Sequence, residues 1–122
     1  MATAAKSAFS QQEWYARLLR TQRAAILTHL REHRQAMIGE RLPEDEGALA
    51  NRTLFEDLAI DTLEREEQLL REIDAALRRL EQGRFGACEL CGEEIPERRL
   101  RALPWTRLCL RCAELQTAFS PN

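Results

Sequence analysis

Two long stretches of the chain contain neither glycine nor proline, and they limit what the chain can fold into. The first runs from Ser10 to Ile38 and the second from Ala48 to Gln82. A sheet protein needs turn residues every few positions and favours β-branched and aromatic residues. Aromatic residues are only 6% of the 122 residues here. The sequence therefore predicts a mainly α-helical protein built around two long helices.

Apolar residues recur in both stretches at the three- and four-residue spacing of an amphipathic helix. In the first stretch we expect a buried stripe made of Trp14, Leu18, Ala25, Ile26, Leu30, His33 and Met37. In the second stretch we expect a seam made of Leu63, Glu66, Leu70, Ile73, Leu77 and Leu80. Ser10 and Glu13 have the spacing of a capping box, which predicts a helix start there. Residues 1–9 are then expected to form a flexible N-terminal tail.

The segment between the two stretches has the composition of a short loop. It reads GERLPEDEG at residues 39–47, with breakers on both sides of an acidic run. So short a connection returns the chain directly, so the two helices should pack as an antiparallel coiled-coil hairpin over residues 10–82. The tip loop of this hairpin is expected near residues 39–47. Because the seam is then buried within one chain, we expect a monomer.

The four cysteines form two CxxC pairs within residues 83–122. Cys88 and Cys91 precede Cys109 and Cys112 with a spacing typical of a four-cysteine zinc site. Two residues between ligands allow a tight knuckle, and four thiolates leave no open position on the ion. We therefore predict one structural zinc ion in a small finger, followed by a short C-terminal helix. A pair of redox motifs is disfavoured, because no βαβ pattern surrounds the cysteines.

Other kinds of chemistry find little support in the sequence. His29 and His33 lie one helical turn apart, but no HExxH motif surrounds them, so we expect surface or seam histidines. The chain lacks a GxSxG serine motif and a glycine-rich phosphate loop, so we assign no catalytic residue and predict that it is not an enzyme. No stretch approaches the ~20 apolar residues of a membrane span, and a signal-peptide core is missing. We therefore expect a cytoplasmic protein without a membrane partner.

The finger segment resembles the zinc-finger region of the DksA/TraR family. That segment reads FGACELCGEEIPERRLRALPWTRLCLRC, and its family-like positions include Phe85, Gly86, Ile95, Arg98, Arg99, Leu100 and Pro104. The preceding hairpin also matches the family in length and direction, so the resemblance covers about residues 10–115. It implies a bacterial transcription regulator that binds RNA polymerase with its coiled coil in the secondary channel. Such a regulator modulates initiation and reads no specific DNA sequence.

The resemblance also implies an acidic functional tip. The family's tip motif, DxxDxA, falls on residues 45–50 of this chain, where Asp45 and Ala50 match. Ala48 replaces the second aspartate, and Glu44 and Glu46 supply neighbouring negative charge. The tip is therefore expected to act more weakly or differently than a complete motif.

The resemblance further implies guanosine tetraphosphate as a ligand. Two basic residues that the family uses for this nucleotide fall on Arg65 and Arg99. A third position, a lysine in the family, is Glu72 here, and its charge would repel a polyphosphate. The substitution argues against nucleotide binding at this site.

One alternative function stays open on sequence grounds. The chain would then be a structural or DNA-binding zinc-ribbon protein whose coiled coil mediates protein–protein association. A DNA-binding finger needs a basic face, but residues 83–122 carry six basic and five acidic residues. The charge balance favours the polymerase regulator.

Overall fold

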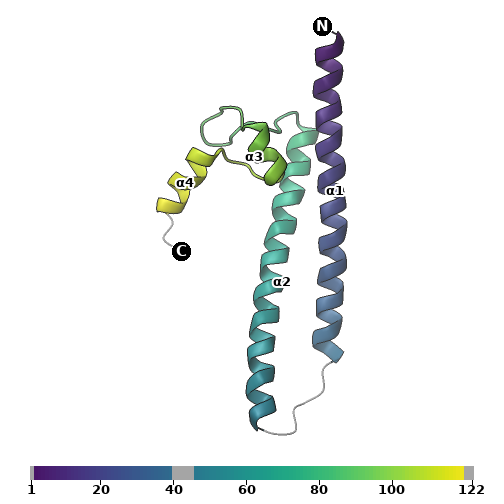
Figure 1. Cartoon of the computed structure of the whole chain (residues 1–122), viewed down its shortest axis with the longest axis vertical. Coiled ribbons are helices and arrows are strands. Elements are labelled where there is room, and N and C mark those ends of the chain that lie inside the picture. The colour runs from purple at the N-terminus through teal and green to yellow at the C-terminus, as the bar shows by residue number, and fades with distance from the viewer. Residues whose placement is uncertain (1, 40–45, 120–122) are drawn as a thin grey trace. The chain divides into compact units, whose positions relative to one another are not determined.

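The computed structural model describes the backbone of residues 2–39 and 46–119 and the side chains of residues 11–36 and 53–118. Within the described backbone the helices are α1 (Ala2–Gly39), α2 (Glu46–Glu81), α3 (Glu97–Ala102) and α4 (Leu110–Phe119) (Figure 1). An isolated antiparallel bridge joins Ala87 to Glu94. The predicted mainly α-helical fold is confirmed. None of the described helices combines the length and apolar character needed to cross a membrane.

The chain divides into two compact units, and each contains one part of α1 and one part of α2. Unit 1 comprises Met1–Gln22 and Glu72–Asn122, and unit 2 comprises Arg23–Arg71. In both units the segments of α1 and α2 lie side by side and run in opposite directions (Figure 1). Unit 1 also contains the whole cysteine-bearing segment. The predicted order of antiparallel helical hairpin, finger and short final helix is therefore confirmed.

The first helix starts earlier than the capping pattern predicts. α1 begins at Ala2, so Ser10 lies inside the helix and the helix extends through the residues where a tail is expected. The segment before Ser10 contains four alanines and neither glycine nor proline. Alanine has the highest helix propensity of all residues, so nothing in this segment stops the helix.

The buried stripe of α1 in unit 1 is shifted by one residue from the predicted stripe. Trp14 is 50% exposed, whereas Tyr15 is 4% exposed and Leu19 is fully buried. The Tyr15 ring packs against Phe85, with ring centroids 5.1 Å apart. Phe85 belongs to the segment after α2, so a contact distant in sequence decides which face of α1 is buried. On α2 the predicted seam residue Ile73 is fully buried.

The stripe in unit 2 follows the prediction more closely. Leu30 is 4% exposed, and Ile26 and His33 are partly buried, while Ala25 is exposed. An ion pair also joins the two helices here, because an Arg34 guanidinium nitrogen lies 2.7 Å from Glu67 Oε1. On the α2 side of unit 2 the predicted seam residues Leu63, Glu66 and Leu70 are all partly buried.

Tyr15, the only tyrosine of the chain, lies in a cluster of buried residues in unit 1. Burial raises the pKa of its hydroxyl above the usual value of 10.0, and the nearby negative charge of Glu97 acts in the same direction. The Arg101 guanidinium opposes this increase. The folded protein therefore holds a phenol proton that the unfolded chain loses more readily.

This difference in pKa predicts a loss of stability at alkaline pH. Above about pH 10 the unfolded chain binds fewer protons than the folded chain, so the free energy of unfolding falls as pH rises. Tyr15→Phe should make this fall shallower. Urea unfolding curves for both proteins at several alkaline pH values measure the effect, and tyrosinate absorbance reports Tyr15 alone. Parallel losses of stability in both proteins would contradict the assignment.

Candidate metal centre

The four cysteine sulfurs converge in unit 1. Their Sγ atoms all lie within 4.8 Å of one another, and the Cys91 and Cys109 sulfurs are 3.9 Å apart. All four residues are free thiols. Four sulfurs bound tetrahedrally at about 2.3 Å from a zinc ion lie about 3.8 Å from one another. The geometry therefore fits one zinc ion held by Cys88, Cys91, Cys109 and Cys112, as predicted.

The first knuckle is closed by backbone hydrogen bonds around Cys88. The Cys88 amide donates to the Glu93 carbonyl at 2.8 Å, and the Gly92 amide donates to the Cys88 carbonyl at 2.9 Å. Gly92 has a φ of 77°, a conformation that side-chain-bearing residues rarely adopt. Glycine at this position therefore lets the chain turn back immediately after Cys91.

The second knuckle is formed at the start of α4. Cys109 immediately precedes this helix, Cys112 lies in its first turn, and the Ala113 amide donates to the Cys109 carbonyl at 2.9 Å. The two knuckles are linked directly, because the Glu89 amide donates to the Arg107 carbonyl at 2.9 Å. The segment between the knuckles contains the short helix α3.

Without a metal ion the clustered thiols compete for protons. Burial opposes ionisation of Cys88, but hydrogen bonds from the backbone near Cys91, Cys109 and Leu90 outweigh it and lower the pKa of Cys88 to about 6. Cys112 forms a hydrogen bond with Cys109, and this bond together with burial raises the pKa of Cys112 to about 12. A bound divalent ion would remove the need for these protons, because a thiol that coordinates a metal ion is deprotonated. The cluster is therefore a site that a metal ion completes.

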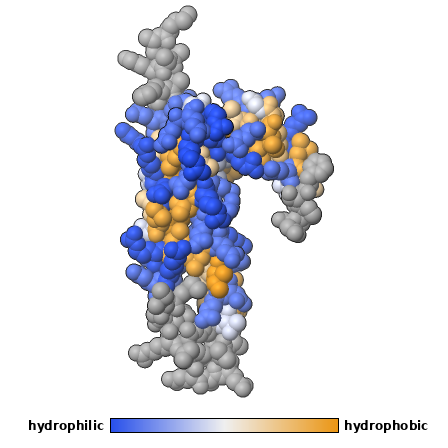
Figure 2. All heavy atoms as spheres, turned by 180° about the vertical axis from the view of Figure 1, so that it is seen from behind, coloured by the Kyte–Doolittle hydropathy of each residue, from blue (hydrophilic) through white to orange (hydrophobic). Residues whose placement is uncertain are grey.

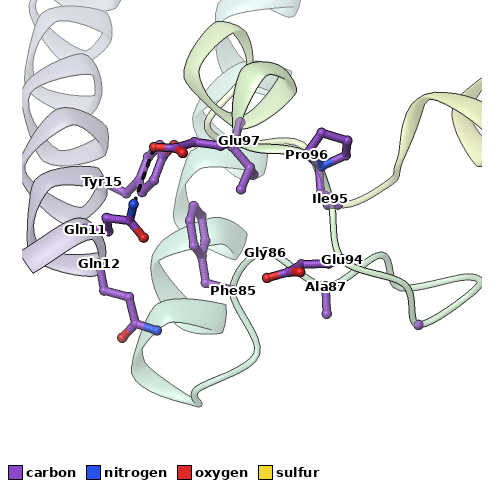
Figure 3. A pocket seen from close by; sticks show the side chains of 12 residues that line it. Gln11, Gln12, Tyr15, Phe85, Gly86, Ala87, Glu94, Ile95, Pro96 and Glu97 are labelled. Atoms are coloured by element: carbon purple, nitrogen blue, oxygen red, sulfur yellow. Dashed lines mark hydrogen bonds between the residues drawn. The ribbon is translucent and has the colours of Figure 1, made fainter. Parts of the chain in front are cut away.

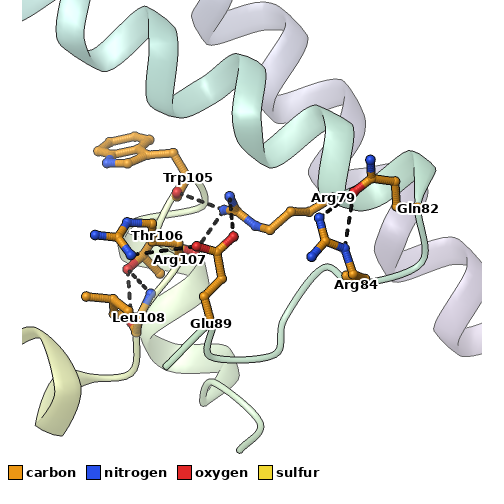
Figure 4. A network of polar contacts seen from close by, with 8 residues as sticks. All are labelled: Arg79, Gln82, Arg84, Glu89, Trp105, Thr106, Arg107 and Leu108. Carbon is orange, nitrogen blue, oxygen red and sulfur yellow. Dashed lines mark hydrogen bonds and ion pairs between the residues drawn. The ribbon is translucent and has the colours of Figure 1, made fainter. Parts of the chain in front are cut away.

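Arg79 connects the end of α2 to the second knuckle, and the sequence analysis does not identify it (Figure 4). It is 4% exposed, and one guanidinium nitrogen donates to the carbonyls of Trp105 at 3.1 Å and Thr106 at 3.2 Å. The other terminal nitrogen lies 3.8 Å from Glu89 Oε1, and Glu89 Oε2 also lies 3.6 Å from Arg107. Burial lowers the pKa of Arg79, and Glu89 partly offsets this. Ala76, three residues earlier on α2, is fully buried, so Arg79 continues a buried face of the helix that the predicted seam does not include.

The residues predicted to bind nucleotide have different surroundings. Arg99 donates from Nε to the Leu108 carbonyl at 3.0 Å and lies 3.5 Å from the Thr106 hydroxyl, so it supports the second knuckle. Arg65 belongs to unit 2, where its side chain is 84% exposed and lies 3.8 Å from Asp61. Glu72 belongs to unit 1 and is partly buried.

The predicted tip residues fall at the edge of what the structure describes. Glu44 and Asp45 lie outside the described residues. The backbone of Glu46 is the first residue of α2, and Ala48 and Ala50 follow in its first two turns. The acidic tip therefore stays a prediction from the sequence.

A pocket in unit 1 lies beside the first knuckle (Figure 3). Tyr15 and Phe85 contribute aromatic surface, and Glu94 and Glu97 contribute carboxylates. The Gln11 side-chain amide donates to Glu97 Oε1 across 3.5 Å. The four cysteines are not among its lining residues, so this pocket is separate from the metal centre.

Comparison with known proteins agrees with this geometry. Residues 83–118 match the model of the prokaryotic dksA/traR C4-type zinc finger. The structure of transcription factor DksA2 from Pseudomonas aeruginosa superimposes with a TM-score of 0.79 at 34% identity, covering 93% of this chain and 88% of that chain. This likeness includes both long helices as well as the finger.

Curated relatives match over shorter stretches. A protein of Aquifex aeolicus is 46% identical over 86 residues, which are 69% of this chain and 59% of the relative. The RNA polymerase-binding transcription factor DksA of Haemophilus influenzae is 43% identical over 58 residues, 48% of this chain and 40% of the relative. The chain thus spans about half the length of the curated relatives it matches.

The Pseudomonas aeruginosa and Haemophilus influenzae relatives are both named as transcription factors, which supports the prediction that the chain is not an enzyme. The C4 finger match and the converging sulfurs together confirm one structural zinc ion. The DksA2 sequence is 34% identical to this one, and the structural match covers most of both chains. The chain therefore belongs to the DksA/TraR family of C4 zinc-finger transcription factors.

Proposed function

We propose that this chain binds bacterial RNA polymerase, places its coiled-coil tip in the secondary channel and so modulates the initiation of transcription. The observation that carries the proposal is the likeness to DksA2 over 93% of this chain, at a TM-score of 0.79. It includes the hairpin as well as the common finger. The Haemophilus influenzae relative is named as RNA polymerase-binding, and this partner implies that the chain acts in the cytoplasm.

An exposed apolar face on α2 supports a protein partner for unit 2. Leu54 is 60% exposed, Phe55 is 68% exposed and Leu58 is 56% exposed. Figure 2 displays apolar surface among hydrophilic side chains on one face of the molecule. Exposed apolar patches on soluble proteins commonly mark interaction sites. We therefore propose that this face of α2 takes part in polymerase binding.

The acidic tip is the proposed effector part of the hairpin. A carboxylate is a preferred ligand of Mg²⁺, so Asp45 near a catalytic magnesium ion would perturb its coordination or the residues around it. Glu44 and Glu46 add negative charge beside it, and Ala50 completes the motif. Because Ala48 lacks the second carboxylate, the effect is expected to be smaller than that of a complete motif.

We propose little contribution from guanosine tetraphosphate. Arg99 already donates to the Leu108 carbonyl, and Glu72 adds a negative charge at the third position. Arg65 alone offers an exposed guanidinium. Transcription assays with and without the nucleotide should therefore differ little.

The binding step is tested by capture of core RNA polymerase on the immobilised full chain. Binding should be displaced by another factor that occupies the secondary channel. Phe55→Ser should weaken capture by at least about tenfold if the apolar face is buried against the polymerase. Ile60→Ser is the matched control, because Ile60 is also an exposed apolar residue of α2 but lies on another side of the helix. Capture that resists the competitor, or equal losses in both variants, would refute the proposed mode of binding.

The tip is tested separately by its effect on transcription. Asp45→Asn should reduce the effect on a ribosomal-type promoter in vitro without reducing polymerase capture, because binding lies along the helices. Ala48→Asp restores the family motif and should strengthen the effect. If neither variant changes transcription while capture persists, the acidic-tip mechanism is wrong and a role as a competing binder is the better explanation.

A further inference from the structure

The pocket of unit 1 that lies beside the first knuckle has no part in the proposed function. Its volume of about 630 Å³ lies within the range of roughly 300–1,000 Å³ that is typical of ligand-binding pockets. Its lining combines two aromatic rings, those of Tyr15 and Phe85, with two carboxylates, those of Glu94 and Glu97 (Figure 3). No basic residue is among the residues that line it. We propose that this pocket binds an arginine side chain of a partner protein.

The charges of the lining favour a cation. The Glu94 carboxylate has no ion pair or side-chain hydrogen bond within the part of the chain that the structure describes. Glu97 Oε1 accepts from Arg101 at 3.0 Å and from Gln11 at 3.5 Å, and no described residue donates to its other oxygen. In Figure 3 the Glu94 carboxylate points toward Phe85, whereas the Glu97 carboxylate extends toward Gln11. The pocket therefore offers carboxylate oxygens from two sides.

The aromatic rings favour a flat cation that is weakly hydrated. The ring centroids of Tyr15 and Phe85 lie 5.1 Å apart, and Phe85 is only partly buried, so part of its ring is accessible. A guanidinium group stacks on aromatic faces and donates two parallel hydrogen bonds to one carboxylate. The ammonium group of lysine is a compact and strongly hydrated charge that lacks this planar geometry. The lining therefore favours arginine over lysine.

A buried hydrogen-bond acceptor lies behind this lining. The Tyr15 hydroxyl oxygen is buried and has no hydrogen-bond partner among the described residues, which is uncommon in native proteins. Figure 3 shows the Tyr15 side chain beside the contact between Gln11 and Glu97. That contact is 3.5 Å long, outside the 2.7–3.2 Å range of ordinary N–H···O hydrogen bonds. A guanidinium group that displaces Gln11 would therefore lose little and gain two acceptors.

The same lining favours an arginine within a polypeptide over the free amino acid. Free arginine carries an α-carboxylate, which Glu94 and Glu97 would repel and which no basic lining residue would balance. An arginine inside a peptide chain lacks this carboxylate. The pocket belongs to unit 1, whereas the exposed apolar face of α2 belongs to unit 2. It is therefore a separate contact surface, and its test does not depend on polymerase binding.

The test is a titration of the zinc-loaded, ¹⁵N-labelled full chain with a capped Gly-Arg-Gly peptide, followed through the amide signals in NMR spectra. We expect saturable shifts at the lining residues Phe85, Gly86 and Gly92. A capped Gly-Lys-Gly peptide and free arginine should each bind at least about fivefold more weakly, and an uncharged citrulline peptide should not bind. Glu94→Gln should weaken binding of the arginine peptide by about tenfold. Because the Glu94 side chain is exposed, this substitution should leave the fold intact.

Glu93→Gln is the matched control for the pocket. Glu93 is the preceding residue and is also exposed, but it is not among the lining residues. Equal losses in the two variants would mean that the peptide responds to the general negative charge of the finger, which would overturn the proposal. The absence of saturable shifts, or equal affinities for the arginine and lysine peptides, would overturn it as well. Free arginine that binds as tightly as the peptide would overturn the assignment to a protein partner.

Discussion

Cys88→Ser is expected to release the zinc ion and unfold the finger while α1 and α2 stay largely helical. Cys88 is 3% exposed and belongs to the buried cluster that also contains Ile95, Leu100 and Leu108. So small a cluster cannot hold the finger together by apolar burial alone, and structural zinc supplies about 10–16 kcal/mol of apparent binding free energy in zinc-finger peptides. Elemental analysis should fall from one tightly held zinc per chain to well below one.

Leu90→Ser provides the matched control for this experiment. Leu90 lies between Cys88 and Cys91 in the same knuckle, but its side chain is 59% exposed and supplies no ligand. This variant should keep its zinc, and its tryptophan fluorescence should match that of the unmodified protein. The interpretation fails if Cys88→Ser retains one zinc per chain, or if its far-UV circular dichroism reveals collapse of the long helices as well.

Arg79→Ala is expected to lower the free energy of unfolding by about 3 kcal/mol. The substitution leaves the Trp105 and Thr106 carbonyls without their donor and removes the guanidinium that pairs with Glu89. Hydrogen bonds to a charged group contribute about 1.5–3 kcal/mol each, whereas the pair with Glu89 adds little because Glu89 is exposed. Urea unfolding of the zinc-loaded protein measures the loss.

Arg78→Ala is the matched control for the buried arginine. Arg78 is the preceding residue of α2 and carries the same charge, but its side chain is exposed. Exposed substitutions of this kind usually change the free energy of unfolding by less than about 0.5 kcal/mol. Equal effects at the two positions would mean that the contacts of Arg79 with the finger add nothing to stability.

Local features were predictable from the sequence because their causes are local. The cysteine spacing identified all four ligands, since each knuckle is closed by hydrogen bonds among neighbouring residues such as Cys88, Gly92 and Glu93. The long runs without glycine or proline identified both helices, since helix propensity acts residue by residue. The start of α1 was missed because the capping box at Ser10 is one local signal among several, and the alanine-rich segment before it favours helix as well.

The sequence by itself thus determined the helical hairpin, the order of the parts and the zinc ligands. Only the tertiary structure decided that Tyr15 rather than Trp14 is buried, because Phe85 packs on that face of α1. It also decided that Arg79 serves the finger, and that Glu66 lies beside the two histidines. These facts join residues far apart along the chain. Propensity and spacing describe only near neighbours, whereas burial and pairing depend on which surfaces the folded chain brings together.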